Sequence, residues 1–166
     1  MKLVINSPKY GKHTVLYDAI DHELISKYNW HLLVDKRFKV IYAITNGETV
    51  NGKRAAGFSM HLLILNFPKS GKIDHKNFNG LDNRRRNLRI CSDFDSARHT
   101  RKPKNNTSGF KGVSFHRASG KYQSRIGFNY TEIRLGLFSN PVDAAKAYNI
   151  AAIKKFGQFA NLNKLP

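Results

Sequence analysis

The sequence has little cysteine, few acidic side chains and no long apolar run. Its single cysteine, Cys91, excludes an internal disulfide and any zinc site made of several cysteines. No apolar run approaches the roughly 18 residues of a membrane-spanning helix, and the apolar stretch at the N-terminus is too short for a signal peptide. We therefore expect a cytoplasmic protein that has no membrane partner.

The scarcity of acidic residues leaves a large positive charge. The 166 residues include 29 Lys and Arg but only 11 Asp and Glu, which gives a formal net charge of +18. No acidic residue occurs from Ser96 through Thr131. Such an excess favours a polyanionic partner. Nucleic acid is the first interpretation, ahead of an acidic membrane surface, because no basic amphipathic helix stands out.

Changes in residue pattern divide the chain into segments. The first is expected to be β-rich, with one helix that Asp21 can cap. A Pro-, Asn- and Gly-containing basic stretch reads as a linker between the second and the last segment. The predicted segments are 1–58 (β-rich), 59–101, 102–109 (linker) and 110–166.

Segment 59–101 predicts a helix at 59–66, then strands at 72–74 and 88–91. Ser92 and Asp95 follow with the S-x-x-D spacing of a capping box, so a helix should begin there. The sum is strand, loop, strand and helix.

Segment 110–166 has the most regular pattern. Three strands are expected, at 110–116, 121–129 and 132–138. Asn140 and Pro141 suit the N-cap and first position of a helix, and apolar residues then repeat at helical spacing as far as Gly157. The expected unit is a three-stranded antiparallel sheet packed on one helix, and the fold class of the whole chain is α+β.

The stretch 72–91 carries the most specific chemistry. Asp74 and His75 are adjacent, and a Gly/Asn-rich loop leads from them to an arginine run and Asn87. A carboxylate can hold a hard divalent cation, and an imidazole can take a proton from water near neutral pH. The combination predicts metal-assisted attack on a phosphodiester. Guanidinium groups that suit a phosphate belong to Arg84, Arg85, Arg86 and Arg89.

This stretch resembles the HNH endonuclease motif, in the form carried by homing endonucleases and phage-encoded nucleases. The resemblance implies a ββα-metal core in which Asp74 binds the metal, His75 is the general base and Asn87 fixes the loop that orients the histidine. It implies a DNA endonuclease that nicks one strand of double-stranded DNA per active site, with Mg²⁺ as the expected cofactor and Mn²⁺ as the alternative. A phage-encoded protein would act in the host cytoplasm, and the oligomeric state stays open.

The third position of the motif departs from the family, because Ser96 stands where the family has a His or Asn metal ligand. Asp95 could supply a carboxylate instead, although the capping box gives it a structural role, and His99 lies one turn further along the same helix. Two functions therefore remain. The chain is an active nuclease with an altered ligand set, or it is a catalytically weakened or inactive DNA-binding protein of the same ancestry.

The last segment carries motifs that include Gly109-Phe110-Lys111-Gly112-Val113, Leu135-Gly136-Leu137-Phe138 and Ala160-Asn161-Leu162-Asn163. They resemble the APETALA/ethylene-response-factor DNA-binding domain. The resemblance implies that the sheet enters the DNA major groove while the helix packs behind it. The implied DNA contacts are Lys111, Ser114, His116, Arg117, Gln123, Arg125 and Arg134. Side-chain alternation independently turns Ser124 and Ile126 toward the helix and leaves Gln123 and Arg125 outward.

Overall fold

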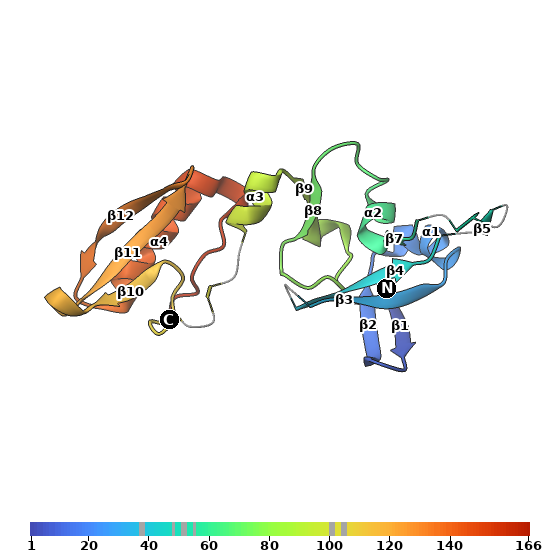
Figure 1. Ribbon diagram of the computed structural model, residues 1–166, viewed down its shortest axis with the longest axis horizontal. Helices are drawn as coiled ribbons and strands as arrows, with labels where there is room; N and C mark the ends of the chain where they lie inside the picture. Colours follow the sequence, from blue (N-terminus) through green and yellow to red (C-terminus); the bar gives the residue numbers. More distant parts are fainter. Residues whose placement is uncertain (37–38, 48, 51–52, 55, 100–101, 104–105) are drawn as a thin grey trace. The chain divides into compact units, whose positions relative to one another are not determined.

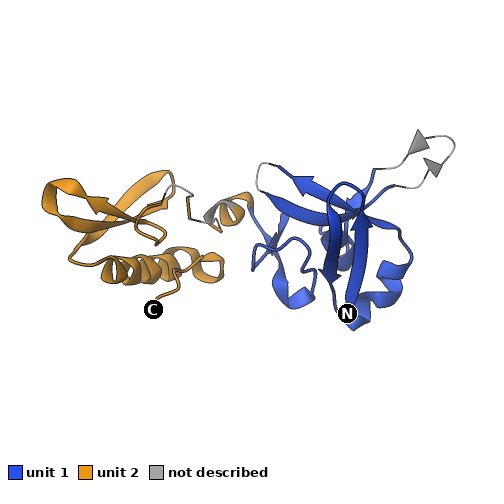
Figure 2. Ribbon diagram, turned by 90° about the horizontal axis from the view of Figure 1, so that it is seen from below, with its two compact units in different colours: residues 1–92 blue, residues 93–166 orange. Residues whose placement is uncertain are grey.

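A computed structural model describes the chain except for residues 37–38, 48, 51–52, 55, 100–101 and 104–105. It consists of two compact units, Met1–Ser92 and Asp93–Pro166 (Figure 2). The strands are β1 (Lys2–Ser7), β2 (Gly11–Leu16), β3 (Trp30–Asp35), β4 (Val40–Thr45), β5 (Thr49–Val50), β6 (Lys53–Arg54), β7 (Phe58–Ser59), β8 (Lys72–His75), β9 (Leu88–Cys91), β10 (Val113–His116), β11 (Lys121–Phe128) and β12 (Thr131–Phe138) (Figure 1). The helices are α1 (His22–Ser26), α2 (Met60–Ile64), α3 (Asp93–Arg98) and α4 (Pro141–Phe156), with 3₁₀ turns η1 (Ala19–Asp21), η2 (Arg85–Asn87), η3 (Arg117–Ser119) and η4 (Gly157–Phe159).

The first unit is built from antiparallel strand pairs. β1 pairs with β2, β8 pairs with β9, and β4 lies between β3 and β7. β3 and β4 form an antiparallel hairpin, and Arg37 in its turn lies outside the described residues. Apolar side chains from these pairs and from α1 and α2 form one core, which contains Ile5, Val15, Tyr17, Ile25, Leu32, Ala43, Met60, Ile64, Leu81 and Leu88.

The loop between β8 and β9 is fixed against the N-terminal hairpin. Leu16 donates its backbone N–H to Leu81 O at 2.8 Å, and its own carbonyl accepts from Asn83 N at 2.7 Å. The loop therefore pairs with the last residue of β2 through one parallel bridge. Leu81, inside the loop, and Leu88, the first residue of β9, are both buried in the core. The polar residues at 82–87 lie between these two leucines, and most backbone hydrogen-bonding groups of this stretch have partners.

In the second unit, α4 packs on one face of the antiparallel sheet β10–β11–β12 (Figure 1). Asn140 caps the helix by accepting from Asp143 N at 2.9 Å, Pro141 is its first residue, and Gly157 follows its end with φ +52°. These are the positions that the sequence predicts. Buried helix residues that meet the sheet are Ala144, Ala145, Tyr148, Ala152 and Phe156.

The predicted α+β class, with antiparallel sheets and a C-terminal sheet plus helix, is confirmed. The helix predicted after Ser92 is present as α3, which belongs to the second unit and contacts η4 there. A proposed cap is wrong: Asp21 makes no side-chain cap to α1, because its buried carboxylate binds Arg85 instead. None of the helices in the described part of the chain is long and apolar enough to span a membrane.

Candidate functional site

His75 is the last residue of β8, and its side chain is enclosed. The residue is 6% exposed, and its Nε2 lies 3.3 Å from Asn83 Oδ1. The rings of His61 and Tyr42 flank it, with centroids 5.1 and 5.9 Å away. Because an amide oxygen only accepts hydrogen bonds, this contact favours the tautomer with the proton on Nε2, in which Nδ1 is the basic nitrogen.

Burial keeps both imidazoles of this cluster neutral. It lowers the pKa of His61 from 6.5 to about 3, and the neighbouring His75 adds to the effect. Burial also lowers the pKa of His75, although the hydrogen bond to Asn83 and the carboxylates of Asp74 and Asp82 oppose the shift. At neutral pH, His75 is therefore in the form that can accept a proton.

Asn87 ties the two ends of the loop together. Its Nδ2 donates to Asp82 O at 2.7 Å and to Asn77 Oδ1 at 3.0 Å, while its Oδ1 accepts from Asn77 N at 3.1 Å. Its own backbone oxygen accepts from Lys76 N at 2.9 Å, directly after His75. This geometry suits the supporting role that the sequence predicts for Asn87, and its part in a reaction stays a prediction.

Asp74 and Arg89 face each other across β8 and β9 in register. Oδ2 of Asp74 accepts from Arg89 Nε at 2.8 Å and from Nη2 at 2.6 Å. The two side chains are only 15% and 10% exposed, so the ion pair is largely desolvated. A residue predicted to hold a metal is thus paired with a residue predicted to contact DNA.

Asp74 is the predicted metal ligand that lies in the first unit. Carboxylate oxygen is the right donor for a hard ion, but Asp74 already binds a guanidinium. No group of three His, Cys, Asp or Glu residues that could hold a metal occurs in the described part of the chain. Asp95 and Ser96 lie on α3 in the second unit, and both the ligand role and the capping role stay predictions.

The other arginines of the run differ in their partners. Arg84 binds the buried Asp82 with Nε and Nη2, both at 2.7 Å, and Arg85 binds the buried Asp21 with Nη2 at 2.6 Å. Arg86 is exposed and makes no ion pair within the described residues. Arg84 and Arg85 therefore have a structural role that the sequence analysis missed, whereas Arg86 is the member best placed for a phosphate.

The outward face of the C-terminal sheet agrees with the predicted alternation. Ser124 and Ile126 are buried against α4, whereas Arg125 is exposed on the opposite face. Cross-strand pairs on that face are Ser114 with Gln123, His116 with Lys121, and Arg125 with Arg134. Arg117 follows in η3. The outward placement is confirmed, and DNA contact by these residues stays a prediction.

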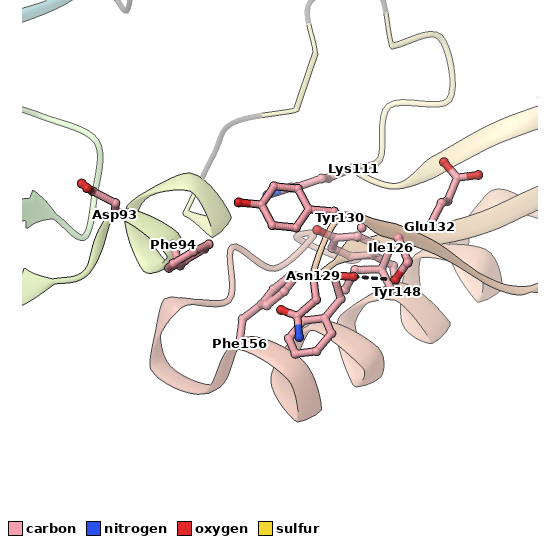
Figure 3. A pocket seen from close by; sticks show the side chains of 12 residues that line it. Asp93, Phe94, Lys111, Ile126, Asn129, Tyr130, Glu132, Tyr148 and Phe156 are labelled. Atoms are coloured by element: carbon pink, nitrogen blue, oxygen red, sulfur yellow. Dashed lines mark hydrogen bonds between the residues drawn. The ribbon is translucent and has the colours of Figure 1, made fainter.

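Lys111 is placed differently from the rest of this set. It precedes β10 and lines a pocket together with Ile126, Tyr148 and Phe156, which are residues of the helix-covered face (Figure 3). The expectation that Lys111 belongs to the outward face does not match this position. The next residue, Gly112, passes so close to the Tyr148 ring that a Cβ would lie 2.1 Å from it.

Comparisons with known proteins agree with both resemblances. The chain is 25% identical over 158 residues, 93% of its length, to an uncharacterised HNH endonuclease of Acanthamoeba polyphaga mimivirus, of which it covers 78%. It is 38% identical over 68 residues, 40% of its length, to APETALA2-like protein 2 of Oryza sativa, and 36% identical over 63 residues to an AP2-like ethylene-responsive transcription factor of Arabidopsis thaliana.

The chain spans only 16% and 13% of the length of these two plant relatives. No protein-family model matches it. The chain is thus similar to an HNH endonuclease over nearly all of its length and to APETALA2-like proteins over about two fifths of it.

Proposed function

We propose that the chain is a metal-dependent DNA endonuclease of the HNH type that nicks double-stranded DNA, with its C-terminal sheet as the DNA-binding part. The observation that carries the proposal is His75. A neutral imidazole is held at the end of β8 by Asn83 and flanking rings, directly after a carboxylate. The comparisons support the same class through the HNH endonuclease relative.

In the proposed reaction, His75 takes a proton from the water that attacks the phosphodiester. Asn83 fixes the ring, and Asn87 keeps the loop that carries Asn83 in place. A divalent ion bound through Asp74 would stabilise charge on the scissile phosphate, with Mg²⁺ expected and Mn²⁺ as the alternative. Asp74 can serve such an ion only where Arg89 releases or shares its carboxylate.

DNA binding follows from charge and from the sheet. A net charge of +18 supplies a strong non-specific attraction to a duplex. The outward residues Gln123, Arg125 and Arg134 are of types that can reach base edges in a major groove. Arg86 adds an exposed cation near the strand pair β8–β9.

Supercoiled plasmid tests the nuclease. Wild-type protein with Mg²⁺ should convert it to open circles, and the conversion should stop when EDTA is added. His75→Ala prepared in the same way should leave the plasmid supercoiled. Equal nicking by both proteins would assign the activity to a contaminant or to another site.

A DNA-binding protein that no longer cleaves is the second candidate. Two observations favour it: Arg89 occupies the Asp74 carboxylate, and Ser96 replaces the expected ligand. In the same experiment such a protein would slow the migration of duplex DNA in a gel, and it would not nick the plasmid at any Mg²⁺ or Mn²⁺ concentration. A phage origin and a homing role are further parts of the proposal that rest on the motif alone.

A further inference from the structure

A pocket of about 840 Å³ lies in the second unit where β11 turns into β12 (Figure 3). This volume is in the range of sites that bind small molecules. Its lining is rich in aromatic rings, and one lysine is among the polar residues. The residues that matter here are Phe94, Phe128, Tyr130, Tyr148, Phe156 and Lys111.

Lys111 is held firmly at this pocket by its backbone. Its N–H donates to Asn163 Oδ1 at 2.6 Å, and its carbonyl accepts from Asn163 Nδ2 at 3.0 Å. Asn149 of α4 in turn binds the Asn163 backbone at both its N–H and its carbonyl. Burial lowers the pKa of Lys111 to about 8. A desolvated ammonium gains from an anion bound beside it.

Tyr130 supplies a solvent-exposed ring at the same pocket. It stands at the tip of the β11–β12 hairpin and is 97% exposed. Its φ of +61° is costly for a bulky side chain, and the preceding Asn129 is also in the left-handed region at +49°. A planar ring presented to solvent beside a cation is the arrangement by which proteins stack unpaired bases.

We propose that this pocket binds an unpaired nucleotide, with the base against the aromatic rings and the phosphate at Lys111. Two acidic residues also line the pocket: Asp93, and Glu132, whose carboxylate is paired with Arg125 Nη1 at 3.3 Å. An apolar side chain of a partner protein would suit the rings but would bring no anion to Lys111. The inference rests on the proposed function, because the strand ends created by a nick can fray and so expose unpaired nucleotides.

The test uses full-length protein and single-stranded oligo(dT) with one central 2-aminopurine. Wild type should bind it and quench the fluorescence by stacking. Lys111→Met and Tyr130→Asn should each weaken binding about tenfold, as expected for one phosphate or one stacking contact. Asn tolerates the left-handed backbone at 130, so the hairpin should persist. Lys154→Met is the control. It removes an exposed positive charge on α4 that does not line the pocket, and it should change the affinity for the oligonucleotide less than about twofold.

Competition with dTMP distinguishes the source of the nucleotide. Full competition by dTMP supports a free nucleotide as ligand, and weak competition supports a nucleotide within a strand. The proposal is overturned if Lys111→Met and Tyr130→Asn bind the oligonucleotide like wild type, or if an abasic oligonucleotide binds equally well. Duplex affinity measured in parallel should be unchanged in Tyr130→Asn. Wild-type protein that binds neither duplex nor single strand would overturn the proposed function itself.

Discussion

Arg89 holds one carboxylate oxygen of Asp74 with two nitrogens, at 2.8 and 2.6 Å, between the paired strands β8 and β9. The proposed metal ligand is therefore neutralised by a side chain of the same motif. A metal ion at Asp74 would have to compete with this guanidinium for Oδ2, and it would be repelled by the positive charge of the guanidinium. We therefore expect the ion pair to lower the affinity of Asp74 for a metal ion.

Arg89→Met should raise the affinity for Mn²⁺ by about tenfold, because it removes the competing cation and keeps the aliphatic stem. Electron paramagnetic resonance of Mn²⁺ titrated into wild type and variant measures this without any cleavage. Asp74→Asn is the matched control and should bind less Mn²⁺ than wild type. Unchanged or weaker Mn²⁺ binding by folded Arg89→Met would show that Arg89 does not compete with the ion, and unchanged binding by Asp74→Asn would show that Asp74 is not the ligand.

Acid should destabilise the first unit through His61. Its pKa is about 3 in the folded chain, below its ordinary value of 6.5, so the unfolded chain binds more protons between these limits. Stability is retained above pH 6.5 and falls as the pH decreases toward 3. The loss should reach about 2 kcal/mol at pH 5.

Urea unfolding at pH 7.5 and pH 5 measures this effect. Trp30 is the one tryptophan of the sequence and lies in the first unit, so its fluorescence follows that unit alone. His61→Phe should remove most of the acid sensitivity, and His75, whose pKa shifts in the same direction, should account for a remainder. An identical pH dependence in wild type and His61→Phe would contradict the assignment.

Arg125 and Arg134 of the sheet should contribute to the preference of the protein for a particular DNA sequence. Arg125→Ala or Arg134→Ala should reduce the ratio of affinities for a selected site and for random duplex, by roughly 1–3 kcal/mol where the arginine reads a base. Arg86→Ala should weaken both affinities alike and lower the salt slope, which for about six phosphate contacts lies near −5. If both sheet variants keep the wild-type ratio, the outward face does not read bases.

Local sequence patterns predicted several of the helices and strands. The cap at Asn140, the helix from Pro141 and strand β9 were all read from residues close in sequence, and alternation along β11 assigned its two faces. The first segment was predicted only as β-rich, and the pairing of β1 with β2 came from the structure.

Long-range ion pairs could not be predicted in the same way. Arg85 and Asp21 are 64 residues apart, so nothing local marks Asp21 as the partner of an arginine rather than as a helix cap. The pair of Asp74 and Arg89 depends on the register of β8 and β9. The position of Lys111 at the pocket beside α4 depends likewise on how the helix packs on the sheet.

Ser96 and Asp95 can be separated by substitution. Ser96→Asn should lower the metal concentration needed for nicking, because an amide oxygen is a better ligand than a neutral hydroxyl. Asp95→Ala should cost about 0.5–2 kcal/mol of stability if the residue only caps α3. Nicking assays across Mg²⁺ and Mn²⁺ concentrations, beside thermal unfolding, measure both. An unchanged metal requirement in Ser96→Asn, together with lost cleavage in folded Asp95→Ala, would assign the ligand to Asp95.

The central claim is that His75 serves the chemical step and not DNA binding. The most direct measurement pre-binds a labelled duplex to excess protein, starts the reaction with Mg²⁺ and follows a single turnover of nicking. His75→Ala should bind the duplex as tightly as wild type, keep the Trp30 fluorescence of a folded first unit, and cleave about 10²–10⁴-fold more slowly. A folded His75→Ala protein that nicks the bound duplex at the wild-type rate would contradict the account.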